Sequence, residues 1–238
     1  MKHAQPRGLS RRHVERLLSK AKAQRSAGSR IEVLSREFLG HPYTINPLVG
    51  SAEAPELFTA SLDGFDCVTY VETVVALSRA ASVDEFIDGL RKIRYAGGQV
   101  VWKRRNHYMT DWIRNNARAG AVRRVAPRSV PPVKKDRILD ELPGLAPVRA
   151  RFECVPKTEL RKLTPHLQTG DLIFFASTFK HRDIFHCGII VRDGDRVLMR
   201  HASRSRGGVV EQELAEFLKA NRMAGVILVR PTEGERAH

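Results

Sequence analysis

The chain of 238 residues is poor in cysteine, and Cys67, Cys154 and Cys187 form no C-x-x-C pair. An odd number of cysteines without ligand spacing argues against both a disulfide framework and a zinc knuckle. None of the nine histidines stands in an H-E-x-x-H motif, which disfavours a metal hydrolase. We therefore expect no metal and no cofactor, and a free thiol that carries chemistry becomes worth searching for.

Long apolar runs are missing as well. No stretch reaches the roughly 20 residues of a membrane span, and the N-terminus lacks the apolar block of a secretory signal. We expect a cytoplasmic protein from the sequence as written, unless export needs no signal or the start is wrongly assigned. A composition of 42% hydrophobic and 28% charged residues predicts one substantial core. We expect a monomer.

Acidic residues are scarce, which leaves a net charge of +15. Residues 1–30 hold nine Lys or Arg, among them Lys2, against the single Glu15. Such a basic amphipathic extension could hold nucleic acid, anionic lipid or an anionic wall polymer. A solvated basic face is the alternative, because no aromatic residue interleaves these charges.

Apolar spacing predicts helices in the first half of the chain and strands in the second. Helices are expected after Ser10, after a Ser29–Glu32 capping box, from Cys67, after a Ser82–Glu85 capping box, and over about 111–119. Five prolines make residues 127–147 a long loop or insertion. Strands are expected over 149–155, 172–175, 187–191, 197–202 and 226–229, with one helix over about 211–219. This order indicates an α+β fold.

Cys67 stands at the predicted start of a helix, a position that suits a nucleophile. It follows the turn-forming stretch from Asp63 to Asp66 and begins a helix, where free N–H groups and the helix dipole favour a thiolate. Its own amide could also bind an oxyanion. A small buried core residue is the alternative explanation of this cysteine.

Two histidines lie on opposite strands of a predicted hairpin. A two-residue Asp193–Gly194 loop pairs Arg192 with Asp195 and, further along the strands, places His186 directly opposite His201. Alternation puts Cys187 on the other face, as buried packing outside the site. The pair therefore predicts a base and the group that orients it, although two ordinary sheet histidines would look the same.

Six motifs in order now resemble a known family. They are Gly64–Glu72, Ile93–Tyr95, Arg105–Tyr108, Gly170–Ile173, His186–Ile189 and His201–Ser203. They look like the motifs of the DUF1460 branch of the NlpC/P60 superfamily, the N-acetylmuramoyl-L-alanine amidase-like proteins, over about residues 40–231. The resemblance implies a papain-like α+β catalytic domain over 31–238, in which a buried cysteine helix packs on a small antiparallel sheet.

The resemblance also implies roles for individual residues. Cys67 would be the nucleophile, His186 the general base and His201 the residue that fixes the tautomer of the base. The substrate would be a muropeptide, held by Tyr43, Asp66, Arg105, His107, Tyr108 and Ser203. The expected reaction is cleavage between N-acetylmuramic acid and L-alanine. Cleavage between γ-D-glutamate and the diamino acid, and a non-catalytic protein that binds wall or nucleic acid, remain alternatives.

Overall fold

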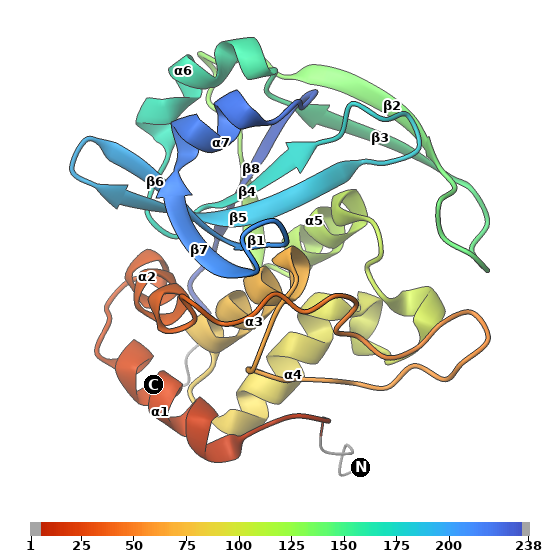
Figure 1. The fold of residues 1–238 in the computed structure, drawn as a ribbon, viewed down its shortest axis with the longest axis vertical. Coiled ribbons are helices and arrows are strands. Elements are labelled where there is room, and N and C mark those ends of the chain that lie inside the picture. Colours follow the sequence, from red (N-terminus) through yellow and green to blue (C-terminus); the bar gives the residue numbers. More distant parts are fainter. Residues whose placement is uncertain (1–5, 235–238) are drawn as a thin grey trace.

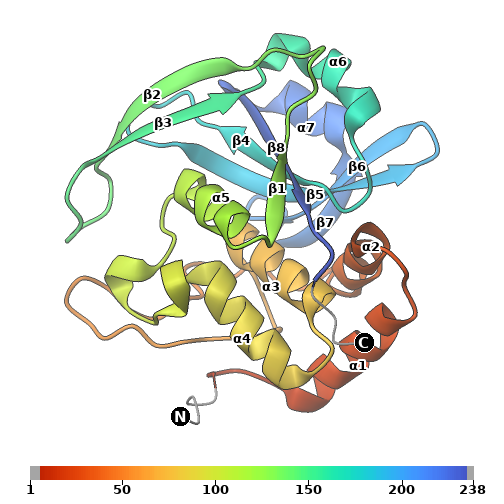
Figure 2. The ribbon, with the colours of Figure 1, turned by 180° about the vertical axis from the view of Figure 1, so that it is seen from behind.

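A computed structural model describes residues 6–234, and the chain is divided between a helical half and a sheet half. The helices of the first half are α1 (Arg11–Lys22), α2 (Ala27–Glu37), α3 (Cys67–Arg79), α4 (Val83–Arg94) and α5 (Met109–Arg118). Figure 1 shows these helices below the sheet, and Figure 2 shows the same layers from behind. No described helix is long and apolar enough to cross a membrane.

The second half forms a six-stranded antiparallel sheet in the order β1-β8-β4-β5-β6-β7. Its strands are β1 (Val122–Val125), β4 (Leu172–Ala176), β5 (Ile184–Asp193), β6 (Arg196–Ser203), β7 (Gly208–Glu213) and β8 (Gly225–Pro231). One face packs on the helical layer, chiefly through α3 and α5, and the other on α6 (Leu160–Leu163) and α7 (Leu214–Ala220). The α+β class expected from the order of the elements is therefore confirmed.

The helix boundaries test the predicted caps. The side chain of Ser10 accepts the His13 N–H and begins α1 as expected. The second helix starts earlier than predicted, because Ser26 and Ser29 form the capping box in place of Ser29 and Glu32. Ser82 does cap α4. The short Ser26 and Ser29 hydroxyls reach each other's backbone N–H groups, so the cap was misassigned by three residues.

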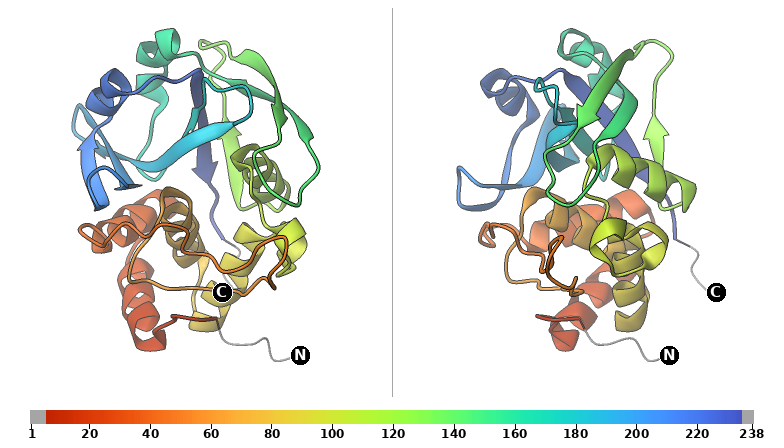
Figure 3. Two further views of the ribbon diagram at one scale, coloured as in Figure 1. Left: turned by 45° about the vertical axis from the view of Figure 1, so that its right-hand side comes forward. Right: turned by 90° about the vertical axis from the view of Figure 1, so that its right-hand side faces the viewer.

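Part of the segment predicted as a proline-rich loop is a strand. Within 127–147, β2 (Val133–Leu139) pairs with β3 (Val148–Cys154) in a separate two-stranded sheet. The hairpin lies along the side of the molecule (Figure 3), where Leu139 and Ala150 pack on Tyr108. Charged residues occupy most of β2, so no apolar alternation marked it as a strand. Strands β1 and β7 were also missed, and the last helix begins at Leu214 because β7 occupies 208–213.

The basic first helix is part of the core. Its apolar residues Val14, Leu17, Leu18 and Ala21 are buried in the same cluster as the residues of α3. Its basic residues lie on the outer face, where Arg11 pairs with Asp84 of α4 at 3.0 Å. Lys2 of the predicted basic extension lies outside the described residues.

Candidate active site

Cys67 is the first residue of α3, and a tight cap presents it. The carboxylate of Asp66 accepts the N–H groups of Val68 at 3.1 Å and Thr69 at 2.7 Å. The Asp66 amide in turn donates to the Thr69 hydroxyl, which completes a capping box. The cap leaves the Cys67 N–H without a partner among residues 6–234. A half-exposed thiol and a free amide thus stand together at the positive end of a buried helix.

Cys187 touches Cys67, which corrects the expectation that it lies outside the site. Its buried thiol donates to the Cys67 carbonyl oxygen at 3.1 Å. Hydrogen bonds from Cys187 and then from His186 hold the pKa of Cys67 well below that of an ordinary thiol, although burial opposes this shift. The same contact with Cys67 raises the pKa of Cys187 well above the usual value. Cys67 is therefore the thiolate and Cys187 the donor.

The two histidines meet, but by a different register from the one predicted. The loop is Gly194–Asp195, with a positive φ of 57° at Gly194, so Asp193 pairs with Arg196. This shift of two residues makes His186 and His201 diagonal neighbours on one face instead of direct opposites. Backbone pairing between β5 and β6 ends at Ile189–Arg200, before either histidine. Beyond that point His186 Nε2 lies 2.7 Å from His201 Nδ1.

Aromatic rings fix the orientation of the base. The His186 ring stacks on Phe217 at 5.3 Å and on Phe175 at 6.3 Å between centroids. Because Nε2 of His186 is engaged by His201, Nδ1 is the nitrogen left to face Cys67. Burial, then the nearby His186 and Arg206, lower the pKa of His201 to about 3, so this imidazole stays neutral. The arrangement can hold a proton on His186 between a thiolate and a neutral acceptor.

Three of the residues expected to bind substrate lie at this site. Asp66 caps α3, and burial followed by the Cys67 charge raises its pKa to about 6. Tyr43 donates its amide to Gly207 at 2.8 Å, and burial followed by Cys67 raises the pKa of its phenol, which keeps the hydroxyl protonated. Ser203 is buried at the end of β6, where its hydroxyl contacts Ser205 at 3.2 Å.

Of the other three, Arg105 and His107 lie around Trp102, and Tyr108 stands at the start of α5. The Arg105 guanidinium covers the Trp102 ring at 4.4 Å and pairs with the buried Glu56 at 3.5 Å. His107 Nε2 bonds to the Trp102 carbonyl at 2.8 Å. Tyr108 is buried against the β2–β3 hairpin. No hydrogen bond, ion pair or ring contact of the described chain joins this cluster to Cys67, His186 or His201.

Sequence reasoning missed Cys187 and Phe217 as members of the site. Alternation along β5 placed Cys187 on the face opposite His186, and that face packs on α3, the helix that begins with Cys67. The signal for the contact was thus present in the pattern. Phe217 lies on α7, whose place over the sheet depends on β7, which was not predicted. Among residues 6–234, no group of His, Cys, Asp or Glu is arranged to bind a metal.

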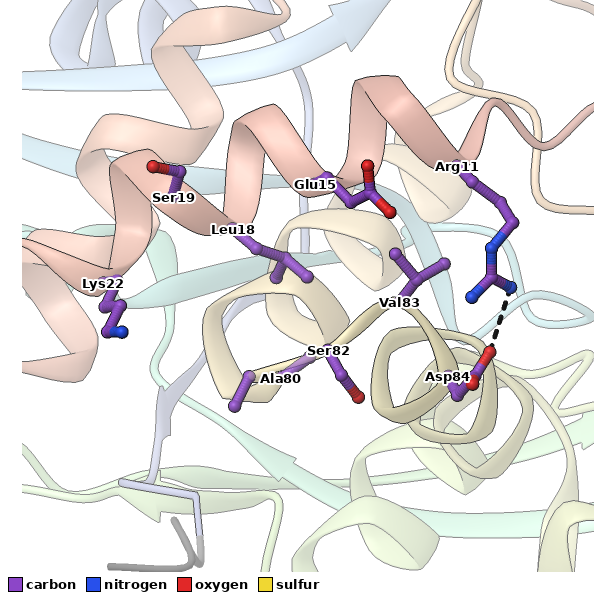
Figure 4. A pocket seen from close by; sticks show the side chains of 10 residues that line it. Arg11, Glu15, Leu18, Ser19, Lys22, Ala80, Ser82, Val83 and Asp84 are labelled. Carbon is purple, nitrogen blue, oxygen red and sulfur yellow. Dashed lines mark hydrogen bonds and ion pairs between the residues drawn. The ribbon is translucent and has the colours of Figure 1, made fainter.

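A separate hollow of about 750 Å³ lies between α1 and the start of α4 (Figure 4). Arg11 and Lys22 on α1 and Asp84 on α4 are among the residues that line it, and Glu15 lies between them. The two basic and two acidic side chains of the lining balance each other, and Arg11 pairs with Asp84 at 3.0 Å. Neither cysteine nor histidine is among the residues that line this hollow.

Comparison with known proteins finds one family and several similar structures. The model of the AmiA-like family, described as N-acetylmuramoyl-L-alanine amidase-like, matches residues 33–226. A crystal structure of an N-acetylmuramoyl-L-alanine amidase from Bacteroides uniformis is 25% identical, covers 87% of this chain and 99% of its own, and superposes with a TM-score of 0.76. A DUF1460 protein from Legionella pneumophila is 20% identical, covers 94% and 96%, and has a TM-score of 0.81. No curated protein sequence matches the chain.

Proposed function

The chain belongs to the AmiA-like family, and on that premise we propose that it is a cysteine amidase that cleaves muropeptides between N-acetylmuramic acid and L-alanine. Cys67 is the nucleophile, His186 the general base and acid, and His201 the residue that orients His186. The observation that carries this proposal is the 2.7 Å contact between His186 Nε2 and His201 Nδ1 beside a thiol of lowered pKa. This is the papain-like arrangement of a nucleophile, a base and an orienting group.

The reaction proceeds by acyl transfer. The Cys67 thiolate attacks the carbonyl carbon of the lactyl amide, and the free Cys67 N–H stabilises the oxyanion. His186 gives its proton to the nitrogen of L-alanine, so the C–N bond breaks and the peptide leaves with a free amine. Neutral His186 then takes a proton from water, and the resulting hydroxide cleaves the thioester. The products are a sugar with a lactyl carboxylate and the regenerated thiolate–imidazolium pair.

The residues beside the site have supporting roles in this proposal. The protonated Tyr43 hydroxyl is a second donor for the oxyanion, and Ser203 bonds to the substrate near β6. Asp66 acts through the cap that positions Cys67. Arg105, His107 and Tyr108 are proposed to support the loop beside the substrate, because their polar groups are largely engaged with Trp102 and Glu56 or buried.

The test is incubation with a defined muropeptide followed by mass spectrometry. The proposal expects two products: a sugar that bears its lactyl carboxylate, and a peptide that begins with L-alanine. A sugar that retains L-alanine and D-glutamate would instead identify the γ-D-glutamyl endopeptidase, which the same residues could support. Absence of either product, from protein whose Cys67 reacts with a thiol probe, would contradict a muropeptide substrate.

A further inference from the structure

One nitrogen next to the site has no hydrogen-bond partner. His201 is only 2% exposed, and its Nε2 makes no hydrogen bond with any residue that the structure describes. Buried polar groups are nearly always paired, so an unpaired imidazole nitrogen beside a reactive thiol calls for an explanation. The other nitrogen of the same ring, Nδ1, is the one that contacts His186.

The chemistry requires a proton on this unpaired nitrogen. When His186 is charged, both of its nitrogens carry protons, and its Nε2–H must donate to His201 Nδ1. His201 is neutral, so its single proton must then be on Nε2. In the opposite tautomer, the Nδ1–H of His201 would face the Nε2–H of the charged His186, and no hydrogen bond could join the two rings. The required tautomer therefore places a donor where the described hydrogen bonds provide no acceptor.

Gln212 on β7 is the polar side chain placed to accept this proton. In the β6–β7 ladder His201 pairs with Val210 and Met199 pairs with Gln212, so Gln212 is a diagonal neighbour of His201 on the same face. Gln212 is half-buried, and its side chain partly opposes the lowering of the His201 pKa by burial. The other groups that face this ring are His186 on β5, the Phe217 ring on α7 and the cation of Arg206. Neither Phe217 nor Arg206 can accept a hydrogen bond.

We propose that Gln212 is a positioning residue whose side-chain carbonyl accepts the Nε2–H of His201 and so fixes the tautomer that receives a hydrogen bond from His186. This inference rests on the proposed pairing of Cys67 with His186. A small rotation of the Gln212 amide completes the bond as the thiolate–imidazolium pair forms. Gln212 touches neither the thiol nor the substrate, and it acts only through His201.

Two readouts that need no substrate test the role of Gln212. Nitrogen NMR of histidine-labelled protein should show His201 protonated at Nε2 and bare at Nδ1, with its signals identified by their loss in His201→Asn. Gln212→Leu keeps the size of the side chain but removes the acceptor. It should mix the two tautomers and move the pH profile of Cys67 alkylation about one pH unit higher.

The matched variants separate this role from simple packing. Gln212→Glu retains an acceptor and should restore both the tautomer and the alkylation profile. Gln168→Leu, at an exposed glutamine of another segment, should leave both unchanged. Modified peptides are identified by mass spectrometry, so that only alkylation of Cys67 is counted.

Two results would overturn the inference: a wild-type His201 protonated at Nδ1, or a Gln212→Leu protein with the tautomer and thiol profile of wild type. The proposed function fails differently. If wild-type Cys67 alkylates only at the pH of an ordinary thiol, the catalytic pairing is wrong, while the nitrogen signals still decide what Gln212 does.

Discussion

Two clusters of polar residues in this molecule both leave buried polar atoms unpaired, but they differ in the groups that stand beside those atoms. Around Cys67, the amide of the nucleophile and Nε2 of His201 are without partners in the described chain, and the base contacts a neutral acceptor. Around Trp102, three buried atoms of Arg105, Trp102 and Glu56 are also without hydrogen-bond partners in the described chain, while His107 bonds to a backbone carbonyl. The first cluster contains a thiol of lowered pKa beside a histidine, whereas the second contains an arginine between an indole ring and a carboxylate.

This difference bears on the role of the residues around Trp102. Arg105, His107 and Tyr108 have the chemistry of a sugar-binding patch, yet Glu56 also accepts the Tyr95 hydroxyl at 2.7 Å and joins the patch to the core. Substitutions in the two clusters should therefore have different consequences. Those around Cys67 should change turnover, and those around Trp102 should change stability.

The largest effect is expected from Cys67→Ala. Removal of the nucleophile should reduce muropeptide cleavage by about 10⁴-fold or more, because the other groups of the site act together with it. Circular dichroism should show an unchanged fold, since the half-exposed thiol contributes little packing. Cys154→Ala is the matched control, because its buried thiol lies away from the site and its loss should cost only stability. Loss of turnover in Cys154→Ala with an intact fold would argue against this assignment.

The two histidines should differ in the size of their effects. His186→Ala removes the group that moves the proton and should lower kcat by about 10³-fold. His201→Asn keeps a side-chain oxygen that accepts from His186 Nε2, so the loss should be only about tenfold. Steady-state kinetics of both variants measure the difference. Equal losses would mean that His201 takes part in proton transfer and does more than orient His186.

A smaller effect is expected at Cys187. Its hydrogen bond stabilises the Cys67 thiolate and lowers the pKa of Cys67, so removal of this donor raises the pKa. The pH profile of Cys67 alkylation should therefore move to higher pH in Cys187→Ala. Cys187→Ser retains a hydroxyl donor and should stay close to wild type. An unchanged pH profile in Cys187→Ala would show that His186, without Cys187, lowers the pKa of Cys67.

The smallest effect on chemistry is expected from Arg105→Met. The change leaves Glu56 buried without its cation and should lower the free energy of unfolding by about 2 kcal/mol. Alkylation of Cys67 should keep the wild-type rate and pH profile. Urea unfolding and thiol alkylation measure the two quantities separately. If the Arg105→Met protein were stable but had a strongly raised KM, Arg105 would belong to the substrate-binding site.

The sequence predicted most of what depends on local pattern. The Ser10 and Ser82 caps, the burial of α3 and the position of Cys67 at its start follow from residue type and spacing within one element. The two histidines were expected on one face of the sheet. They do lie on one face, because a register shift of two residues leaves the face of each side chain unchanged. The shift itself was not predictable from Asp193–Gly194, since Gly194–Asp195 is an equally short loop with glycine at its first position.

What could not be predicted depends on contacts between distant segments. β2 contains mostly charged residues and becomes a strand only because β3 pairs with it. β7 is fixed by its pairing with β6, and Pro42 bridges to Gly208 at its beginning. The contacts of His107 with Trp102 and of Arg105 with Glu56 were not predicted, because loops without periodicity set these positions.

The division of the site between the two halves of the chain also bears on folding kinetics. Cys67 begins a helix of the first half, while Cys187 and His186, which lower its pKa, lie about 120 residues later. Helical contacts are local and form quickly, whereas the sheet requires β8 to pair with β1 and β4 across long separations. Until β5 docks on α3, Cys67 therefore lacks the hydrogen bonds from Cys187 and His186 that lower its pKa. The low pKa of this thiol is thus a property of the completed tertiary structure.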